Sequence, residues 1–181
     1  LARNPANQRN QAVEFSIKST HPDKQRTACT VVGIFENGQL TAAAAMLDRA
    51  CGNALRTLIE RGDFEGRNGA SLMLHHVPNS PCERILLIGL GKEKEFREKD
   101  YGNAVRAAMK ALKDCGAAEA YLTLTTLTVT NRDSAWKIRQ AVLIGQESGY
   151  RFEQFKSKKG DKTPPLAHLL LAVDNRKEIA A

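Results

Sequence analysis

The sequence has no hydrophobic run that approaches the ~18 residues needed by a membrane-spanning helix. It also does not open with the basic, then apolar, then small-residue pattern of a secretory signal peptide. These two absences argue against a membrane protein or a secreted one. We therefore expect a soluble, cytoplasmic protein with no membrane partner.

The sequence lacks a C-x-x-C pair and any Cys/His cluster with the spacing of zinc ligands. Its four cysteines lie far apart, at Cys29, Cys51, Cys82 and Cys115. Free cysteine is usually buried, so we predict reduced thiols in the core. His75 and His76 are adjacent and would point to opposite faces of a strand, which makes joint metal binding unfavourable. We predict that they are structural or partly buried, and that this chain holds no metal or other cofactor.

Nucleotide-binding and catalytic motifs are incomplete. Gly89-Leu90-Gly91 follows an apolar run, as in a dinucleotide-binding turn, but Lys94 stands where the third glycine belongs. The phosphate-binding pattern G-x-x-x-x-G-K-[ST] fails too, because Glu93 replaces its final hydroxyl. No G-x-S-x-G elbow or acid/base pair is marked out. The sequence therefore disfavours nucleotide binding at this turn and identifies no catalytic residue.

Apolar residues make up 42% of the 181 residues, enough for a single domain with its own core. The stretch 71–91 is its centre. Apolar runs at Leu72–Val77 and Ile85–Leu90 flank a turn at Pro78–Pro81. The second run is uninterrupted, as in a strand that is covered on both faces. We predict a central antiparallel pair of strands, on which the other elements pack.

Four more strands and three helices are predicted around this pair. Alternation favours strands over 14–19, 28–35 and 119–129, the last with one polar face, and a final strand begins at Leu166. The first two helices are capped by Thr41 and Asp100, and the last helix begins near Asp133. The first helix is interrupted at Gly52, and Gly145 lets the last helix approach the sheet closely. The resulting order, β-β-α-β-β-α-β-α-β, predicts an α/β three-layer sandwich. Its mixed sheet has about six strands, covered by helices.

The net charge of +7 is concentrated near the last predicted helix. Such a stripe can neutralise the phosphates of duplex DNA. A solvated basic loop explains it equally well, since nearby aromatic residues have core-like spacing. The candidate DNA-binding residues are Arg132, Lys137, Arg139, Arg151, Lys156, Lys158, Lys159 and Lys162.

Several short motifs occur in an order and spacing that resemble one known family. They include EFSIKS at Glu14, LHHVPN at Leu74, ERILLIG at Glu83, and WK followed by RQAV at Trp136. From residue 13 to about 175, the sequence resembles the amino-terminal domain of the leucyl aminopeptidase family (cytosol aminopeptidase, peptidase M17). Within that family it is most similar to the bacterial aminopeptidase A branch.

This resemblance implies a macro-domain-like fold and a parent enzyme that is a hexameric metalloexopeptidase. The parent is expected to remove amino-terminal residues such as leucine, with two divalent metal ions (manganese or zinc) in a separate carboxy-terminal domain. That domain carries the signature N-T-D-A-E-G-R, which this chain does not contain. We therefore expect the chain to be inactive alone and to have no catalytic, cofactor-binding or metal-binding residue.

The resemblance also implies partners and boundaries. The expected partners are the parent's catalytic domain, the other subunits of a homo-hexamer and, as in the aminopeptidase A branch, duplex DNA bound as an accessory factor or transcriptional repressor. A small-molecule ligand in a macro-like cleft is a third possibility. We expect 1–12 to be a disordered leader or cloning remnant, 13–175 the domain, and 176–181 the start of a linker to the catalytic domain.

Overall fold

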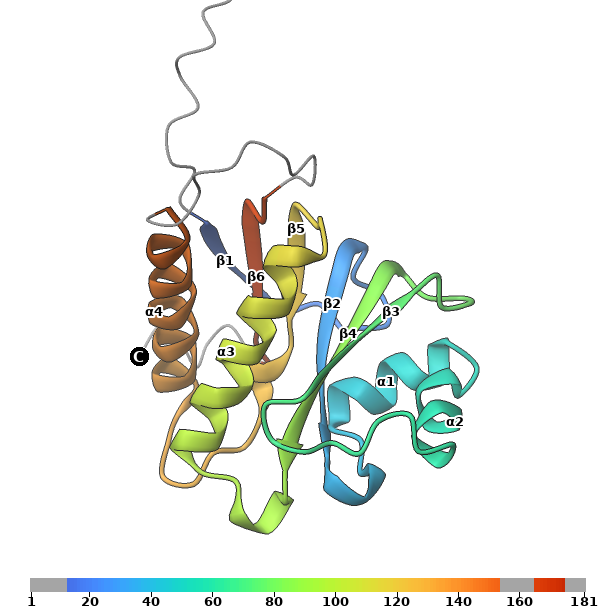
Figure 1. The fold of residues 1–181 in the computed structure, drawn as a ribbon. Coiled ribbons are helices and arrows are strands. Elements are labelled where there is room, and N and C mark those ends of the chain that lie inside the picture. Colours follow the sequence, from blue (N-terminus) through green and yellow to red (C-terminus); the bar gives the residue numbers. More distant parts are fainter. Residues whose placement is uncertain (1–12, 154–164, 175–181) are drawn as a thin grey trace, which may run out of the picture.

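The computed structural model describes residues 13–153 and 165–174 (Figure 1). They form six strands and four α-helices, in the predicted order apart from a first helix that is divided in two. The strands are β1 (Glu14–Lys18), β2 (Thr27–Phe35), β3 (Ser71–His75), β4 (Cys82–Gly91), β5 (Glu119–Leu122) and β6 (His168–Ala172). The helices are α1 (Ala42–Ala50), α2 (Ala54–Glu60), α3 (Glu98–Asp114) and α4 (Ser134–Glu153).

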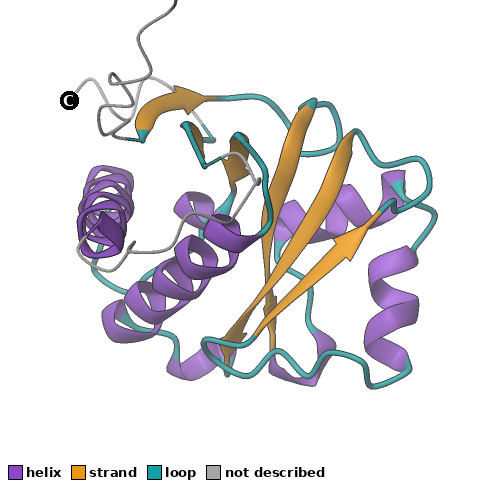
Figure 2. Cartoon of the chain, turned by 45° about the horizontal axis from the view of Figure 1, so that its top comes forward, coloured by secondary structure: helices purple, strands orange, loops and turns teal. Residues whose placement is uncertain are grey.

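The strands form one mixed sheet in the order β1-β6-β5-β2-β4-β3. All neighbouring strands are parallel except β3 and β4, which are antiparallel. Figure 2 shows α1 and α2 on one face of the sheet and α3 and α4 on the other. The predicted α/β three-layer sandwich on a mixed six-stranded sheet is therefore confirmed. No helix in the described part of the chain is long and apolar enough to cross a membrane.

Strand β2 lies between two hydrophobic cores because successive side chains of a strand point to opposite faces. Val31 and Phe35 pack in the core beneath α3 and α4. Val32 and Ile34 pack in the core beneath α1 and α2. Strand β4 divides its side chains in the same way, which explains its uninterrupted apolar sequence.

The predicted hairpin at 71–91 exists, but its placement at the centre of the sheet was wrong for its first strand. Strand β3 lies at the edge and is only partly buried, whereas β4 pairs with β2 on its other side. His75 ends β3, and His76 follows with a φ of 54°. Both histidines are exposed rather than partly buried, because they stand at the open end of an edge strand.

The strand predicted over 119–129 was too long. Strand β5 ends at Leu122, and a 3₁₀ turn follows at Leu124–Thr126. Thr123 and Thr125 are buried rather than on a wet face: Thr123 Oγ1 donates to the Val31 carbonyl and Thr125 Oγ1 to the Ala172 carbonyl, both at 2.7 Å. Buried hydroxyls that satisfy carbonyls on neighbouring strands produce the same alternation as a half-exposed strand.

One of the two predicted helix caps is correct: Thr41 accepts a hydrogen bond from the Ala44 amide at 3.3 Å. The last helix begins next to Asp133 as predicted, and Asp133 accepts a hydrogen bond from the Trp136 amide at 2.7 Å. Helix α3 begins before Asp100, which instead accepts a hydrogen bond from the amide of the N-cap residue Arg97 at 3.0 Å. Gly145 brings α4 close to the sheet as predicted, since a Cβ there would lie 2.8 Å from Phe15 Cζ.

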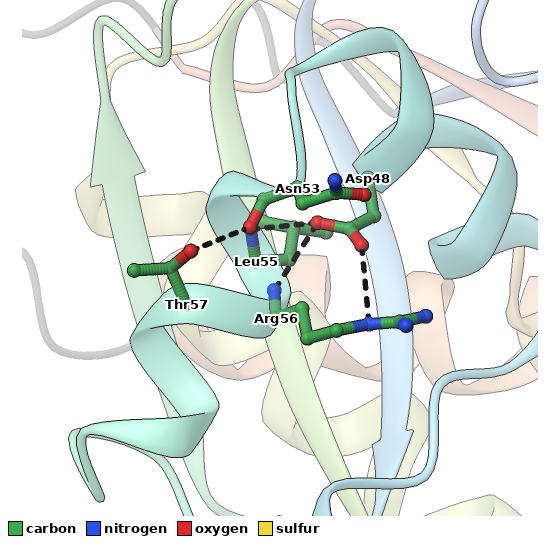
Figure 3. Close-up of polar contacts among 5 residues, drawn as sticks. All are labelled: Asp48, Asn53, Leu55, Arg56 and Thr57. Atoms are coloured by element: carbon green, nitrogen blue, oxygen red, sulfur yellow. Dashed lines mark hydrogen bonds and ion pairs between the residues drawn. The ribbon is translucent and has the colours of Figure 1, made fainter.

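The interruption at Gly52 separates α1 from α2, and a buried carboxylate fastens the two helices together (Figure 3). Asp48, only 1% exposed, accepts hydrogen bonds from the Leu55 amide at 2.9 Å and the Arg56 amide at 3.1 Å. The Arg56 Nε lies 3.8 Å from its second oxygen. An aspartate of α1 therefore satisfies amides of the first turn of α2, which have no partner within that helix.

Candidate functional site

The amino-terminal end of α4 gathers part of the predicted DNA-binding set in one shallow depression. Arg132, Trp136 and Arg139 line it, together with the capping residue Asp133, and its volume is about 620 Å³. Trp136 and Arg139 are three residues apart on the helix, a spacing that places side chains on one face. A cationic surface with an aromatic ring is compatible with nucleic-acid backbone and base contacts.

Arg132 and Arg139 differ in how much of their charge is available. The Arg132 Nε donates to a Glu98 carboxylate oxygen at 2.7 Å, and its guanidinium carbon lies 5.1 Å from the centre of the Trp136 ring. The ion pair and the cation–π contact both hold this guanidinium in place. Arg139 is exposed on the same surface. Arg139 is therefore the better candidate for a phosphate contact.

Lys137 does not belong to this surface, which corrects one of the predicted DNA contacts. Its side chain is only 7% exposed, and its ammonium donates to the Leu127 carbonyl at 2.8 Å. Its own carbonyl accepts the Tyr101 hydroxyl at 2.9 Å, and burial raises the pKa of that tyrosine. Lys137 thus joins α4 to α3 and to the chain before α4. Nothing in the residue pattern indicates that its charge is internal.

The other predicted DNA contacts are not placed by the structure. Arg151 lies in α4, but the position of its side chain is not described. The remaining four lie outside the described residues; they are Lys156, Lys158, Lys159 and Lys162.

Gly89, Leu90 and Gly91 end strand β4, and their packing role leaves no space for a phosphate. A Cβ at Gly89 would lie 2.0 Å from the Arg67 carbonyl oxygen, because the segment before β3 crosses directly over this glycine. The Gly69 and Gly91 amides donate to the Gly89 and Gly66 carbonyls at 3.0 and 2.8 Å. The glycines therefore permit close contact between two parts of the backbone.

A cavity of about 190 Å³ lies where ligands bind in open α/β sheets, outside the carboxyl ends of parallel strands. Thr20, Tyr121, Thr123 and Asp174 are among its lining residues. The Tyr121 hydroxyl donates to the Thr20 carbonyl at 2.5 Å, and burial, with a smaller effect of Asp174, raises its pKa to about 12. Ligand pockets commonly have roughly 300–1,000 Å³, so this cavity does not favour a dinucleotide-sized ligand.

The four cysteines are free thiols, and three of them are buried as predicted. Cys115 is the exception, because it is only half-buried at the end of α3. Its thiol donates a hydrogen bond to the Leu112 carbonyl at 3.2 Å. Within the described residues, no group of three or more His, Cys, Asp or Glu side chains could hold a metal ion.

The strand order and the pair of helices on each face define an α/β fold of the macro-domain type. The macrodomain of Mycobacterium tuberculosis DarG has a TM-score of 0.61 at 11% identity, over 89% of this chain and 99% of its own. A mutant of tomato leucine aminopeptidase has a TM-score of 0.66 at 20% identity, over 93% of this chain and 35% of its own. At these identities the likeness concerns the fold alone.

The sequence comparisons specify the family. Residues 31–159 match the model described as cytosol aminopeptidase family, N-terminal domain. The probable cytosol aminopeptidase of Dechloromonas aromatica is 49% identical over 168 residues, which cover 93% of this chain and 34% of that protein. The chain therefore belongs to the cytosol aminopeptidase family, as its N-terminal domain, and spans about a third of the length of its curated relative. The resemblance found from the short motifs is confirmed.

Proposed function

We propose that this chain, from residue 13 to 175, is the non-catalytic N-terminal domain of a cytoplasmic leucyl aminopeptidase. The observation that carries the proposal is the family match over 31–159, together with 49% identity to a probable cytosol aminopeptidase of which the chain covers 34%. The whole enzyme removes amino-terminal residues, leucine preferentially, from peptides. Two divalent ions, manganese or zinc, bound in its other domain would supply the Lewis-acid chemistry for this hydrolysis.

In this proposal the domain serves assembly, and its partners are the catalytic domain and the other subunits of a hexamer. Its surface offers a place for such contacts on α4, where Leu143 keeps 47% of its surface exposed. A large aliphatic side chain that stays in water on an otherwise polar helix face is stabilised when a partner covers it. The depression lined by Arg132, Trp136 and Arg139 lies at the start of the same helix. A partner that covers Leu143 can therefore also make ionic contacts.

The isolated chain is expected to hydrolyse leucine p-nitroanilide no faster than buffer in the presence of manganese. The longer protein that contains it is expected to hydrolyse the substrate, because the ions and their ligands lie outside this domain. Both proteins are compared by nitroaniline release, with circular dichroism as the control for folding. Hydrolysis by the folded isolated chain would contradict the non-catalytic role, and an inactive longer protein would contradict the aminopeptidase activity.

DNA binding is a second candidate function, favoured by the exposed Arg139 beside Trp136 and Arg132. The affinity for duplex DNA is expected to fall as salt rises, and Arg139→Ala is expected to reduce the slope of log K against log salt by about one. Arg132→Ala is expected to have a smaller effect, because Glu98 already neutralises this guanidinium. Fluorescence anisotropy of a labelled duplex over a salt series measures both.

Arg49→Ala is the matched control for this experiment. Arg49 is also an exposed arginine on a helix, but α1 covers the opposite face of the sheet from α4. An equal loss of slope in Arg49→Ala and Arg139→Ala would remove the α4 surface from the DNA site. Charge reversal of Lys156, Lys158 and Lys159 tests the remaining predicted contacts in the same assay.

A further inference from the structure

Strand β3 leaves one side of its backbone without a neighbouring strand. It lies at the edge of the sheet and pairs only with β4 (Figure 1). Next to its two ends, the Ala70 carbonyl accepts from the Gly89 amide at 2.8 Å, and the His76 amide donates to the Glu83 carbonyl at 3.2 Å. Because bonding alternates along an antiparallel pair, the even-numbered residues between them also bond to β4. The odd-numbered residues therefore direct their N–H and C=O groups outward; they are Ser71, Met73 and His75.

The outward side of β3 lacks the features that commonly prevent two edge strands from pairing. Such strands usually carry a charged residue, a proline or a bulge. Strand β3 has the sequence SLMLH and pairs with β4 in unbroken register, so it has none of the three. In the described part of the chain, no hydrogen bond reaches its outward N–H and C=O groups. These groups can therefore bond to an added strand.

A second copy of β3 fits this edge if a two-fold axis passes beside Met73. In antiparallel pairing about this axis, Met73 faces the partner's Met73, and Ser71 faces the partner's His75. Each of these residues directs its backbone groups outward, so each facing pair exchanges two hydrogen bonds. Every outward donor and acceptor of the two strands thus obtains a partner.

The side chains of β3 also suit pairing with a copy of itself. Leu72 and Leu74 are half-buried and lie on the face covered by α1 and α2. The same axis places Leu72 opposite the partner's Leu74, in a non-hydrogen-bonded pair, where side chains come closest. The four leucines of the two copies then form one apolar cluster. Removing their remaining exposed surface from water favours the pairing.

Charge favours this edge as a contact between two copies. Each chain has a net charge of +7, so two copies repel each other, but β3 carries no charge when its histidine is neutral. No like charges therefore face each other between the two strands. A standard stable interface buries about 1,600 Å², and two strands of five residues each cover less than that. We therefore expect a weak dimer that dissociates on dilution.

We propose that β3 pairs with β3 of a second copy of this chain, so that the two sheets continue into each other across a two-fold axis. This goes beyond the assembly role proposed above, because it names the surface, the partner strand and the register of one contact. The pairing needs no catalytic domain and is tested on the chain alone. A negative result would therefore leave the aminopeptidase assignment unaffected.

The test follows the purified 181-residue chain by sedimentation velocity over a concentration series. The unchanged chain is expected to pass from monomer to dimer as its concentration rises. In the double variant Ser71→Lys/His75→Lys, lysines face each other at both ends of the paired strands, so the Kd of the dimer is expected to rise at least tenfold. Both positions are exposed, so the folded monomer should accommodate the lysines. The matched control is Thr128→Lys/Thr130→Lys, which adds the same charge at two exposed positions before α4 and should change the Kd much less.

Amide hydrogen exchange followed by NMR assigns the contact to single residues and needs no variant. The amides of Ser71, Met73 and His75 are expected to exchange about tenfold more slowly in concentrated than in dilute protein. The Leu72 and Leu74 amides bond to β4 and should be protected at both concentrations. A chain that stays monomeric, a dimer with the same Kd in both double variants, or outward amides whose exchange does not depend on concentration would overturn the proposal.

Discussion

Gly89→Ala is expected to destabilise the protein by about 3 kcal/mol or more, because overpacking against backbone cannot be relieved by a change of rotamer. The new Cβ would lie 2.0 Å from the Arg67 carbonyl oxygen and 2.8 Å from the carbonyl carbons of Arg67 and Gly66. Relief requires the segment before β3 to move away from β4. That movement breaks the hydrogen bonds from the Gly69 amide to the Gly89 carbonyl and from the Gly89 amide to the Ala70 carbonyl. Urea unfolding followed by circular dichroism measures the loss.

Gly102→Ala is the matched control for the same substitution. At Gly102, in α3, the nearest atom to a new Cβ is Arg106 Nη1 at 3.1 Å, the end of a flexible side chain that can move aside. Alanine is favoured over glycine in a helix by about 1 kcal/mol, so this variant should be neutral or slightly more stable. A Gly89→Ala protein that unfolds at the same urea concentration as the unchanged protein would show that the crossing segment is not packed as described.

Asp48→Ala is expected to cost about 2–4 kcal/mol, the sum of a lost helix cap and of amides left without partners in a buried site. The Leu55 and Arg56 amides both donate to one oxygen of this carboxylate, and Leu55 is the fully buried residue in the first turn of α2. Without the carboxylate, the first turn of α2 loses its connection to α1. The midpoint of thermal unfolding, followed by circular dichroism, is expected to fall accordingly.

Two variants separate the cap from the ion pair. Arg56→Ala is expected to cost less than about 1 kcal/mol, because the ion pair is long, at 3.8 Å, and the arginine is 61% exposed. Asp48→Asn keeps an oxygen that accepts from the amides, so its loss of stability should be smaller than that of Asp48→Ala. If Arg56→Ala proves as destabilising as Asp48→Ala, the ion pair rather than the cap holds the two helices together.

The sequence predicts the fold well where one residue pattern has one structural meaning. The unbroken aliphatic run of β4 indicates a strand covered on both faces, and that is its position. The stripe from Tyr101 to Leu112 indicates one buried face of α3, and these residues are buried. In both elements, the spacing of apolar residues along the sequence indicates which faces are buried.

The fold predictions are wrong where the environment of a residue depends on a contact with a segment far away in the sequence. The hairpin sequence shows that β3 and β4 pair but not that β2, much earlier in the chain, takes the other side of β4. Thr123 and Thr125 are polar in sequence but buried in the structure, since their acceptors are carbonyls of β2 and of the chain's last described strand. Lys137 is predicted to be a surface charge for a similar reason: helix periodicity does not show that the Leu127 carbonyl accepts a hydrogen bond from its ammonium.

The candidate sites show the same limit. The three-residue spacing of Trp136 and Arg139 on α4 was available in the sequence as a sign of a shared surface. The gathering of Thr20, Tyr121 and Asp174 around one cavity was not, because these residues lie at or just after the ends of three different strands. A site on one helix face can therefore be predicted in part from the sequence, whereas a site between distant segments needs the folded chain.

The division of β2 between two cores has a consequence for how the molecule melts. Cys29, Val31 and Phe35 support one helical layer, and Val32 and Ile34 support the other. Detaching this strand would open both layers at once, so neither can persist as an independent subdomain. The protein is therefore expected to unfold in one cooperative transition, whether by heat or by denaturant. Tryptophan fluorescence, which reports on the α4 side, and circular dichroism, which reports on the backbone, should change over the same range.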